Sequence, residues 1–249
     1  MEALIQEKLR EIEGRENCRV LLAVESGSRA WGFASPDSDY DVRFIYVRPR
    51  ESYLRLDRPR DVIELPIDGV LDVSGWDLDK TLKLLRKSNP TVFEWFSSPL
   101  VYRTTPFAGA FQSVMRRYFL SKAGLWHYLQ MAEGNYRESL RGGMVRAKKY
   151  FYVLRPVLAC RWILETGTPP PMPFSELAES QLPAYLEDAV KELLDLKMNA
   201  PEVQMIPRID ALNEYLEQSM AEIRELVRQY PRESPGDWEE LNALFLSAL

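Results

Sequence analysis

The residues best suited to chemistry in this chain lie in one segment, Glu25 to Tyr46. An apolar run, RVLLAV, leads towards Gly27-Ser28, where glycine permits a turn whose amide N–H groups and Ser28 hydroxyl can face an anion. Asp39 and Asp41 follow at the start of the next apolar run, and a spacing of two places both carboxylates on one face of a strand. Two adjacent negative charges repel each other unless a cation lies between them. The segment therefore predicts half of a phosphate site beside a cation site.

Basic residues lie close to both parts of this segment. Arg43 continues the face that carries the two acids, whereas Val42 and Phe44 point to the opposite, apolar face. Arg29 directly follows the Gly-Ser turn. Either arginine can contact phosphate, or each can be the structural partner of a carboxylate. For the strand as a whole, the alternative is an exposed edge on which Asp and Arg pair locally.

Composition limits the chemistry further. His127 is the only histidine, and Cys18 and Cys160 are the only cysteines, which excludes a Cys/His zinc site, a His-based triad and a disulfide framework. Catalysis must then use carboxylates with a metal ion, or lysine, tyrosine or arginine. The longest uncharged stretch, Thr104–Met115, is shorter than the roughly 20 apolar residues of a membrane-spanning helix, and the charged N-terminus does not resemble a signal peptide. We therefore expect a cytoplasmic protein without a membrane partner.

The order of these residues matches a known pattern. Gly27-Ser28, followed by Ser38-Asp39-Tyr40-Asp41 on the next strand, resembles the signature of the DNA polymerase β superfamily of nucleotidyltransferases. The wider sequence, with GSRAWGFASPDSDYDVRFIY, GWDLDKTLKLLRKSNPTVFEW and SSPLVY, is more closely similar to the RlaP-type family of nucleotidyltransferases associated with RNA repair. The likeness is strong in the first part of the chain and looser in the later segment VRAKKYFYVLRPVLACRWI.

The resemblance implies a third carboxylate, from a later strand, that completes a site for two metal ions. Asp72 in GVLDVSGW is the best candidate, because a lone acid in an apolar strand needs a reason. Asp68 fits turn chemistry better, and Asp77 fits an N-cap or first-turn position in the following helix. Asp39 and Asp41 would bridge both ions, and Asp72 would hold the ion that lowers the pKa of the acceptor hydroxyl. Ligation by carboxylate oxygen alone selects Mg²⁺, or Mn²⁺.

The resemblance also implies a nucleoside triphosphate (NTP) as substrate, gripped by Gly27 and Ser28 with Arg29 or Arg43 as further contacts. Cations for the triphosphate often come from the helical domain in this superfamily, and Lys148 or Lys149 is the natural source.

On the predicted helix that carries these lysines, Lys148, Tyr152 and Arg155 follow one another at spacings of four and three, and this face can line a cleft. The alternative is an ordinary solvated basic face.

Charge is distributed unevenly along the chain, whose formal net charge is −5. Residues 175–249 carry six basic and sixteen acidic residues, whereas residues 116–161 carry ten basic and two acidic ones. The same segment also carries Tyr118, Trp126, Tyr128, Tyr136, Tyr150 and Tyr152. Basic residues interleaved with aromatic ones suit phosphates and bases, so with the resemblance they favour the 3′ end of an RNA as the acceptor. The alternative is a helical bundle whose basic face pairs with the acidic C-terminal helices.

The elements that must position these residues follow from hydrophobic periodicity. Short apolar runs predict strands at residues 19–24, 42–47 and 70–73, after an amphipathic first helix, and the spacing becomes helical from Trp76 onward. We predict an α+β fold, with a small mixed nucleotidyltransferase sheet and flanking helices in residues 1–104 and a helical substrate-binding bundle in residues 105–249.

The function predicted from this pattern is transfer of a nucleoside monophosphate from an NTP to a hydroxyl, with release of pyrophosphate. One alternative is the same chemistry on a small molecule or on a protein, as in AMPylation. The alternative from a different class is a non-catalytic nucleotide- or RNA-binding module, which is expected to have lost the acidic pair that this sequence retains. The pattern predicts no oligomeric state.

Overall fold

The computed structural model describes residues 1–67, 69–199 and 204–249, and its chain forms two compact units. We call them the sheet unit, which comprises Met1–Ala30, Asp39–Phe119 and Pro235–Leu249, and the helical unit, which comprises Trp31–Ser38 and Leu120–Ser234. These bounds differ from the predicted ranges 1–104 and 105–249. The sheet unit extends further along the chain and includes the C-terminus, and the helical unit includes a short early segment.

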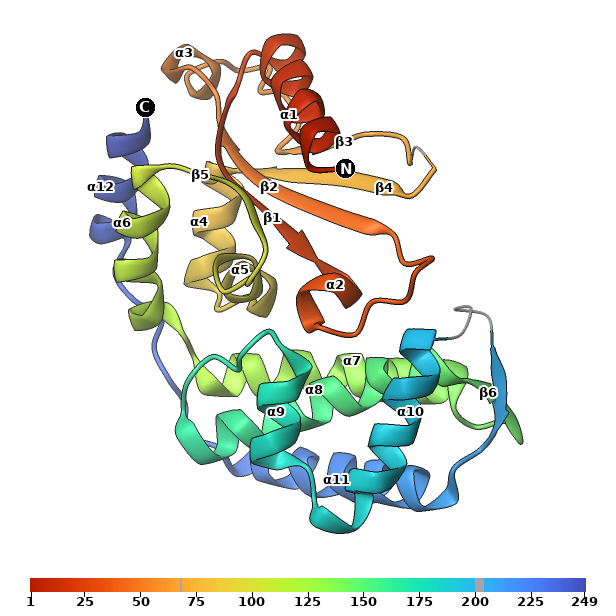
Figure 1. Ribbon diagram of the computed structural model, residues 1–249. Helices are drawn as coiled ribbons and strands as arrows, with labels where there is room; N and C mark the ends of the chain where they lie inside the picture. Colours follow the sequence, from red (N-terminus) through yellow and green to blue (C-terminus); the bar gives the residue numbers. More distant parts are fainter. Residues whose placement is uncertain (68, 200–203) are drawn as a thin grey trace. The chain divides into compact units, whose positions relative to one another are not determined.

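A mixed five-stranded sheet forms the centre of the sheet unit, with the strand order β3-β4-β2-β1-β5 (Figure 1). The strands are β1 (Arg19–Ser26), β2 (Tyr40–Val47), β3 (Val62–Glu64), β4 (Leu71–Asp77) and β5 (Val101–Thr104). β2 and β4 pair in parallel, and the other neighbours pair antiparallel. The three strands predicted from apolar runs are present as β1, β2 and β4, whereas β3 and β5 lie at the two edges of the sheet and were not predicted.

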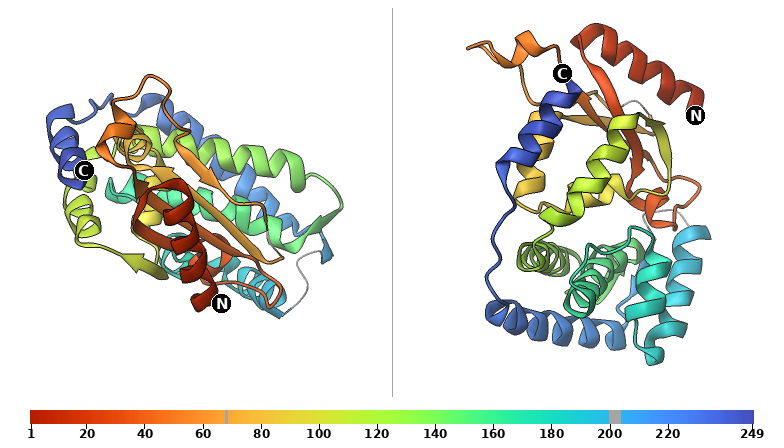
Figure 2. Two further views of the ribbon diagram at one scale, coloured as in Figure 1. Left: turned by 90° about the horizontal axis from the view of Figure 1, so that it is seen from above. Right: turned by 90° about the vertical axis from the view of Figure 1, so that its left-hand side faces the viewer.

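Helices cover both faces of this sheet. On one face, Ile5, Leu9 and Ile12 of α1 (Glu2–Glu16) join a buried cluster with Val42 and Phe44 of β2. The helices of the other face are α4 (Leu78–Arg86), α5 (Pro90–Phe96), α6 (Pro106–Met115) and α12 (Trp238–Ala248), which lie together beside the sheet (Figure 2). Two shorter helices, α2 (Gly27–Trp31) and α3 (Arg50–Tyr53), follow β1 and β2.

The bounds of the sheet unit follow from its second core. Phe111 of α6 is fully buried and stacks on Phe96 of α5, with ring centroids 3.9 Å apart. Leu241 and Leu244 of α12 are buried in the same cluster. Residues 105–119 and the C-terminal helix therefore belong to the sheet unit, because their apolar side chains are buried in its core.

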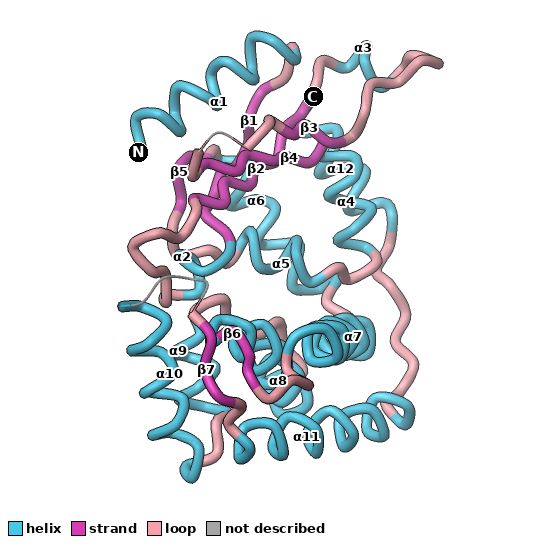
Figure 3. The backbone as a smooth tube through the Cα atoms, turned by 90° about the vertical axis from the view of Figure 1, so that its right-hand side faces the viewer, coloured by secondary structure: helices cyan, strands magenta, loops and turns pink. Residues whose placement is uncertain are grey.

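In its described residues, the helical unit contains five helices: α7 (Ser121–Ser139), α8 (Ala147–Thr166), α9 (Phe174–Gln181), α10 (Glu187–Asn199) and α11 (Asp210–Gln229). Figure 3 shows them with the small antiparallel pair β6 (Met144–Arg146) and β7 (Met205–Pro207). Two 3₁₀ turns, Arg116–Tyr118 and Ala184–Leu186, complete the elements. Helix α8 is buried on most sides, and Phe33 of the early segment packs on Phe151 and Phe174 at centroid distances of 4.8 and 5.7 Å. Phe33 thus makes segment 31–38 part of this core.

The predicted α+β class, a small mixed sheet with flanking helices together with a helical bundle, is confirmed. Within the residues that the structure describes, no helix combines the length and the apolar character needed to cross a membrane.

Candidate active site

Asp41 and Asp72 lie side by side on the parallel strands β2 and β4. The register pairs Asp41 with Asp72 and, two residues on, Arg43 with Ser74. Paired residues of neighbouring strands point to the same face of a sheet. Both carboxylates are half-buried, with 29% and 31% of each side chain exposed. Two acids that are distant in sequence therefore share one partly solvated position.

Arg43 holds these two carboxylates together. Its Nη2 lies 3.1 Å from Asp41 Oδ1 and 2.7 Å from Asp72 Oδ2, and its Nη1 donates to the backbone carbonyls of Val42 and Asp72 at 3.1 Å each. These bonds engage both terminal nitrogens of the guanidinium, so Arg43 acts here as the structural partner of the carboxylates. Because Arg43 carries one positive charge and the two carboxylates carry two negative charges, the three side chains together keep a net negative charge.

Gly27 lies directly against Asp41, at the start of α2. Its φ of +65° is one that residues with side chains rarely adopt, and a Cβ placed on it would approach Asp41 Oδ2 to 2.3 Å. Glycine is therefore required both by the turn and by the close approach of the carboxylate. Ser28, in the first turn of α2, is half-buried beside it.

Glu25 is a buried acid that sequence reasoning missed. It is fully buried in β1, where Oε1 accepts a hydrogen bond from the backbone N–H of Asp41 at 2.8 Å and Oε2 accepts one from the hydroxyl of Tyr102. Burial raises the pKa of Glu25, and the bond from Tyr102 partly opposes that rise. The side chain thus fixes the backbone of Asp41. The sequence contains a sign that Glu25 belongs to the site, because it is an acidic residue between the apolar run and Gly27.

Asp39 is not gathered into the pair formed by Asp41 and Asp72. It precedes β2, its side chain is exposed, and its backbone carbonyl accepts a bond from Arg29 Nε at 3.0 Å. The guanidinium of Arg29 also covers the ring of Tyr40, with Cζ 3.7 Å from the ring centroid. Across the described ranges, no three His, Cys, Asp or Glu side chains form a group that could hold a metal ion.

Asp77 has the capping role that its position suggested. Its side chain accepts a bond from Asp79 N at 2.9 Å as the N-cap of α4, and the hydroxyl of Tyr53 donates to it at 2.9 Å. It is 4% exposed, and this burial raises its pKa. Asp77 is paired with Tyr46, on the face opposite to that of Asp72. Asp68 lies outside the described residues.

The basic face predicted for α8, with Lys148, Tyr152 and Arg155, is not continuous, because Arg155 is buried. Lys148 and Tyr152 are half-buried residues of the helical unit, and Lys149 Nζ lies 5.1 Å from the centroid of the Tyr152 ring. Arg155, which we expected on the same face, is only 2% exposed, and its Cζ lies 4.8 Å from the Trp31 ring centroid. Arg155 thus belongs to the interior of the helical unit.

The aromatic residues of the basic segment serve mainly the core. Tyr118, Tyr128, Tyr136 and Tyr150 are each at most 6% exposed. The basic residues are partly paired with acids of the C-terminal helices, as in Arg161 with Glu222 at 3.0 Å. Part of this segment therefore follows the alternative interpretation, in which a basic face of the helical bundle pairs with the acidic C-terminal helices.

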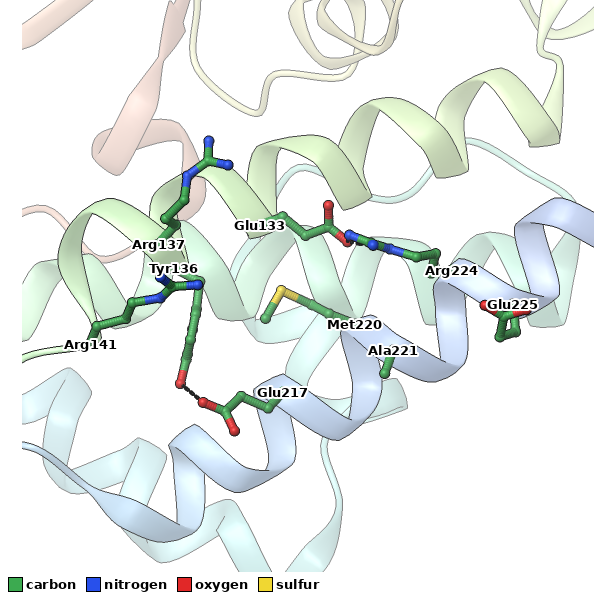
Figure 4. Close-up of a pocket in the computed structure, with 9 residues that line it drawn as sticks. All are labelled: Glu133, Tyr136, Arg137, Arg141, Glu217, Met220, Ala221, Arg224 and Glu225. Carbon is green, nitrogen blue, oxygen red and sulfur yellow. Dashed lines mark hydrogen bonds and ion pairs between the residues drawn. The ribbon is translucent and has the colours of Figure 1, made fainter.

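Two arginines of the segment, Arg137 and Arg141, line an open pocket of about 520 Å³ between α7 and α11 (Figure 4). Glu133 of this pocket is paired with Arg224, and Tyr136 donates its hydroxyl to Glu217. These contacts engage two of the carboxylates that line the pocket. Arg137 itself is exposed.

The chain is similar to known proteins and to one protein family. The chain is 43% identical over 255 residues to the uncharacterized protein YcgL of Bacillus subtilis (strain 168), a match that covers 100% of this chain and 96% of the relative. A crystal structure of a nucleotidyltransferase-like protein from Exiguobacterium sibiricum 255-15 matches 90% of this chain and 75% of its own, with 14% identity and a TM-score of 0.33. The family model described as "RlaP: RNA repair pathway DNA polymerase beta family" matches residues 1–247. The chain therefore belongs to the RlaP family, which is described as an RNA repair pathway DNA polymerase beta family.

Proposed function

We propose that this protein transfers a nucleoside monophosphate from an NTP to a hydroxyl group, and that the acceptor is the 3′ end of an RNA. The observation that carries the proposal is the pairing of Asp41 with Asp72 on adjacent parallel strands, with the Gly27 backbone against Asp41. Membership of a polymerase β family supports the same chemistry.

The residues present fit a divalent cation. Asp41 and Asp72 offer carboxylate oxygens at one half-exposed position, and oxygen donors suit Mg²⁺ or Mn²⁺. Arg43 supplies one positive charge to the pair, so a net negative charge remains for a cation to balance. We propose Asp41 and Asp72 as ligands; Asp39, whose exposed side chain is not gathered with them in this structure, stays a predicted third ligand. Bound there, the metal would lower the pKa of the acceptor hydroxyl and neutralise the leaving pyrophosphate.

The chain's own residues bind and orient the substrate in this proposal. The backbone at Gly27 and the hydroxyl of Ser28 hold the triphosphate, with Arg29 as a further contact. The acceptor oxygen forms a bond to the α-phosphorus while the bond from that phosphorus to the bridging oxygen breaks, and its electron pair leaves with pyrophosphate. The proton of the acceptor hydroxyl passes to solvent.

The RNA acceptor is supported by two facts about the chain. Residues 116–161 carry ten basic and two acidic residues, and Arg137 remains exposed among them. The family description names an RNA repair pathway.

A transfer assay tests the proposal. Labelled RNA with a free 3′ hydroxyl, the same RNA with a blocked 3′ end, an aminoglycoside and a bulk protein acceptor are each incubated with the four NTPs, with Mg²⁺, with Mn²⁺ and with chelator. We expect NMP addition only to the free 3′ hydroxyl and only with metal.

The possible outcomes separate the alternatives. Transfer to the aminoglycoside or the protein instead of the RNA would retain the chemistry and reject the acceptor. No transfer to any acceptor, together with tight NTP or RNA binding, would favour the non-catalytic binding module.

A further inference from the structure

Segment 31–38 joins the two halves of the candidate site along the chain, although it belongs to the helical unit. Gly27 and Ser28 precede it in α2, and Asp39 and Asp41 follow it. The contacts that hold this segment therefore determine where the chain leaves the Gly-Ser turn and where it enters β2.

Aromatic packing holds the first part of the segment. The ring of Trp31 meets that of Tyr152 of α8 edge-on, with centroids 5.6 Å apart, and Phe33 packs on Phe151 as described above. Phe33 is 2% exposed. These apolar contacts end at Phe33, so the part of the segment next to Asp39 depends on other interactions.

The last part of the segment is a tight turn from Ser35 to Ser38. The N–H of Ser38 donates to the carbonyl of Ser35 at 3.1 Å, and the N–H of Ser35 donates to Ser38 Oγ at 3.0 Å. The two hydroxyl oxygens lie 2.9 Å apart. Pro36 occupies the second position, where its fixed φ favours such a turn. Both serines are only 2% exposed, so the turn directs its hydroxyls into the protein.

Lys197 of α10 binds both hydroxyls of this turn. Its Nζ donates to Ser35 Oγ at 2.9 Å and to Ser38 Oγ at 3.4 Å. Lys197 is 4% exposed, and it is the only buried lysine in the described part of the chain. A buried ammonium group costs more free energy than an apolar side chain of the same length unless polar contacts compensate for it. Packing alone therefore does not account for a lysine at this position.

We propose that Lys197 is a positioning residue for Asp39. It anchors the turn that ends directly before Asp39, and so fixes the backbone from which that carboxylate reaches a divalent cation held by Asp41 and Asp72. This role rests on the proposed function, which supplies the cation. Residues that orient a metal ligand typically change metal affinity by roughly 10- to 100-fold when they are replaced.

Direct metal binding tests the role without any transfer activity. The full chain, without NTP or RNA, is titrated with Mn²⁺, and the free ion is measured by electron paramagnetic resonance. Lys197→Met keeps the length of the side chain and removes the charge and the donors. We expect its Kd for Mn²⁺ to be about tenfold higher than that of the parent. Lys191→Met makes the same exchange at an exposed position of α10, and we expect it to bind as the parent does.

Ser35→Ala tests the same contact from the side of the turn. It removes the acceptor of the shorter bond from Lys197, so we expect a similar rise in the Kd for Mn²⁺. The double variant should bind no more weakly than Lys197→Met, because both changes break one interaction. The Tm of Lys197→Met should stay close to that of the parent, because loss of a buried charge offsets the lost bonds. If Lys197→Met does not fold, Ser35→Ala carries the test.

Hydrogen exchange of the metal-free protein measures the anchoring itself. The peptide that covers residues 33–41 should exchange faster in Lys197→Met and Ser35→Ala than in the parent and in Lys191→Met, because a segment with fewer contacts opens more often. Faster exchange together with weaker Mn²⁺ binding is the result that supports the proposal.

Three results would overturn it. Unchanged exchange in both variants would show that Lys197 does not hold the segment. Unchanged Mn²⁺ binding in both variants would show that the segment does not position a ligand, and it would leave the proposed function intact. Failure of the parent to bind Mn²⁺ would reject the cation of the proposed function together with this role, so the two failures are distinguishable.

Discussion

Replacement of Asp72 by asparagine separates the chemical role of this residue from its structural one. The change keeps the size of the side chain and removes one of the two carboxylates that share the β2–β4 position. If Asp72 is a metal ligand, the rate of transfer should fall at least about 100-fold, since loss of an electrostatic stabiliser at a reacting centre commonly costs that much.

The effect of Asp72→Asn on stability should be small. The ion pair with Arg43 is 2.7 Å long but partly exposed on both sides, so its loss costs about 1 kcal/mol or less. Removal of a negative charge beside Asp41 offsets part of that cost. The Tm should therefore move by roughly 2–4 °C or less in a chain of this size. Thermal melts and steady-state rates of the same preparation measure both effects.

Asp77→Asn is the matched control, because it makes the same change five positions along the same strand. Asp77 points to the other face and caps α4, and asparagine is as good an N-cap as aspartate. We expect full activity and a change in stability within about 1 kcal/mol. An inactive Asp77 variant beside an active Asp72 variant would refute the assignment of the ligand.

The pKa of Asp77 adds a pH dependence to this control. Burial raises its pKa in the folded protein above that of the unfolded chain. The folded state therefore binds this proton more tightly, and the contribution to stability is present at pH below the unfolded pKa and lost as pH rises through the folded one. Asp77→Asn should remove this part of the decline in Tm with rising pH. An unchanged profile would contradict the assigned cause of the shift.

Three further outcomes are expected. Gly27→Ala should abolish transfer and lower the free energy of unfolding by about 1–3 kcal/mol in chemical denaturation, because φ is +65° and a Cβ would meet Asp41 Oδ2. An active and stable variant would show that the close approach of Gly27 to Asp41 is not needed. Asp41→Ala should abolish transfer without unfolding the protein, since Arg43 keeps its bonds to Asp72. Full activity would exclude Asp41 as a metal ligand. Lys148→Ala should raise the KM for NTP. Arg137→Ala should weaken RNA binding and reduce by about 0.7 the slope of log affinity for RNA against log salt concentration. Identical effects of the two variants would contradict separate roles for the two residues.

Much of the sheet could be predicted because its central strands carry apolar residues over most of at least one face. The runs in β1, β2 and β4 are visible as hydrophobic segments, and they carry the acids of the candidate site. The edge strand β5 has no such signal, since its four residues VYRT are exposed or half-buried. Its position depends on contacts from outside the strand, such as Arg103 with Glu13 of α1 at 2.8 Å.

The parts of the site that the sequence did not predict depend on register between distant elements. Glu25 reaches the Asp41 backbone only because β1 and β2 pair with Ser26 opposite Asp41. Arg155 has the spacing of a surface residue on α8, but the ring of Trp31 covers it. Local periodicity identifies which side of an element is polar, and it does not reveal which later or earlier segment covers that side.

The position of α12 in the sheet core has a consequence for biosynthesis. Leu241 and Leu244 fill a core that otherwise comes from residues before position 120, so the sheet unit can be complete only after residues 120–234 of the helical unit have also been synthesised. Domains usually fold in the order of their synthesis, whereas here the helical unit is fully translated before the last helix of the sheet unit exists. A nascent or prematurely terminated chain would thus carry the acidic residues without the packing that holds their strands. The strands that carry Asp41 and Asp72 therefore gain their complete core only after α12 has been synthesised.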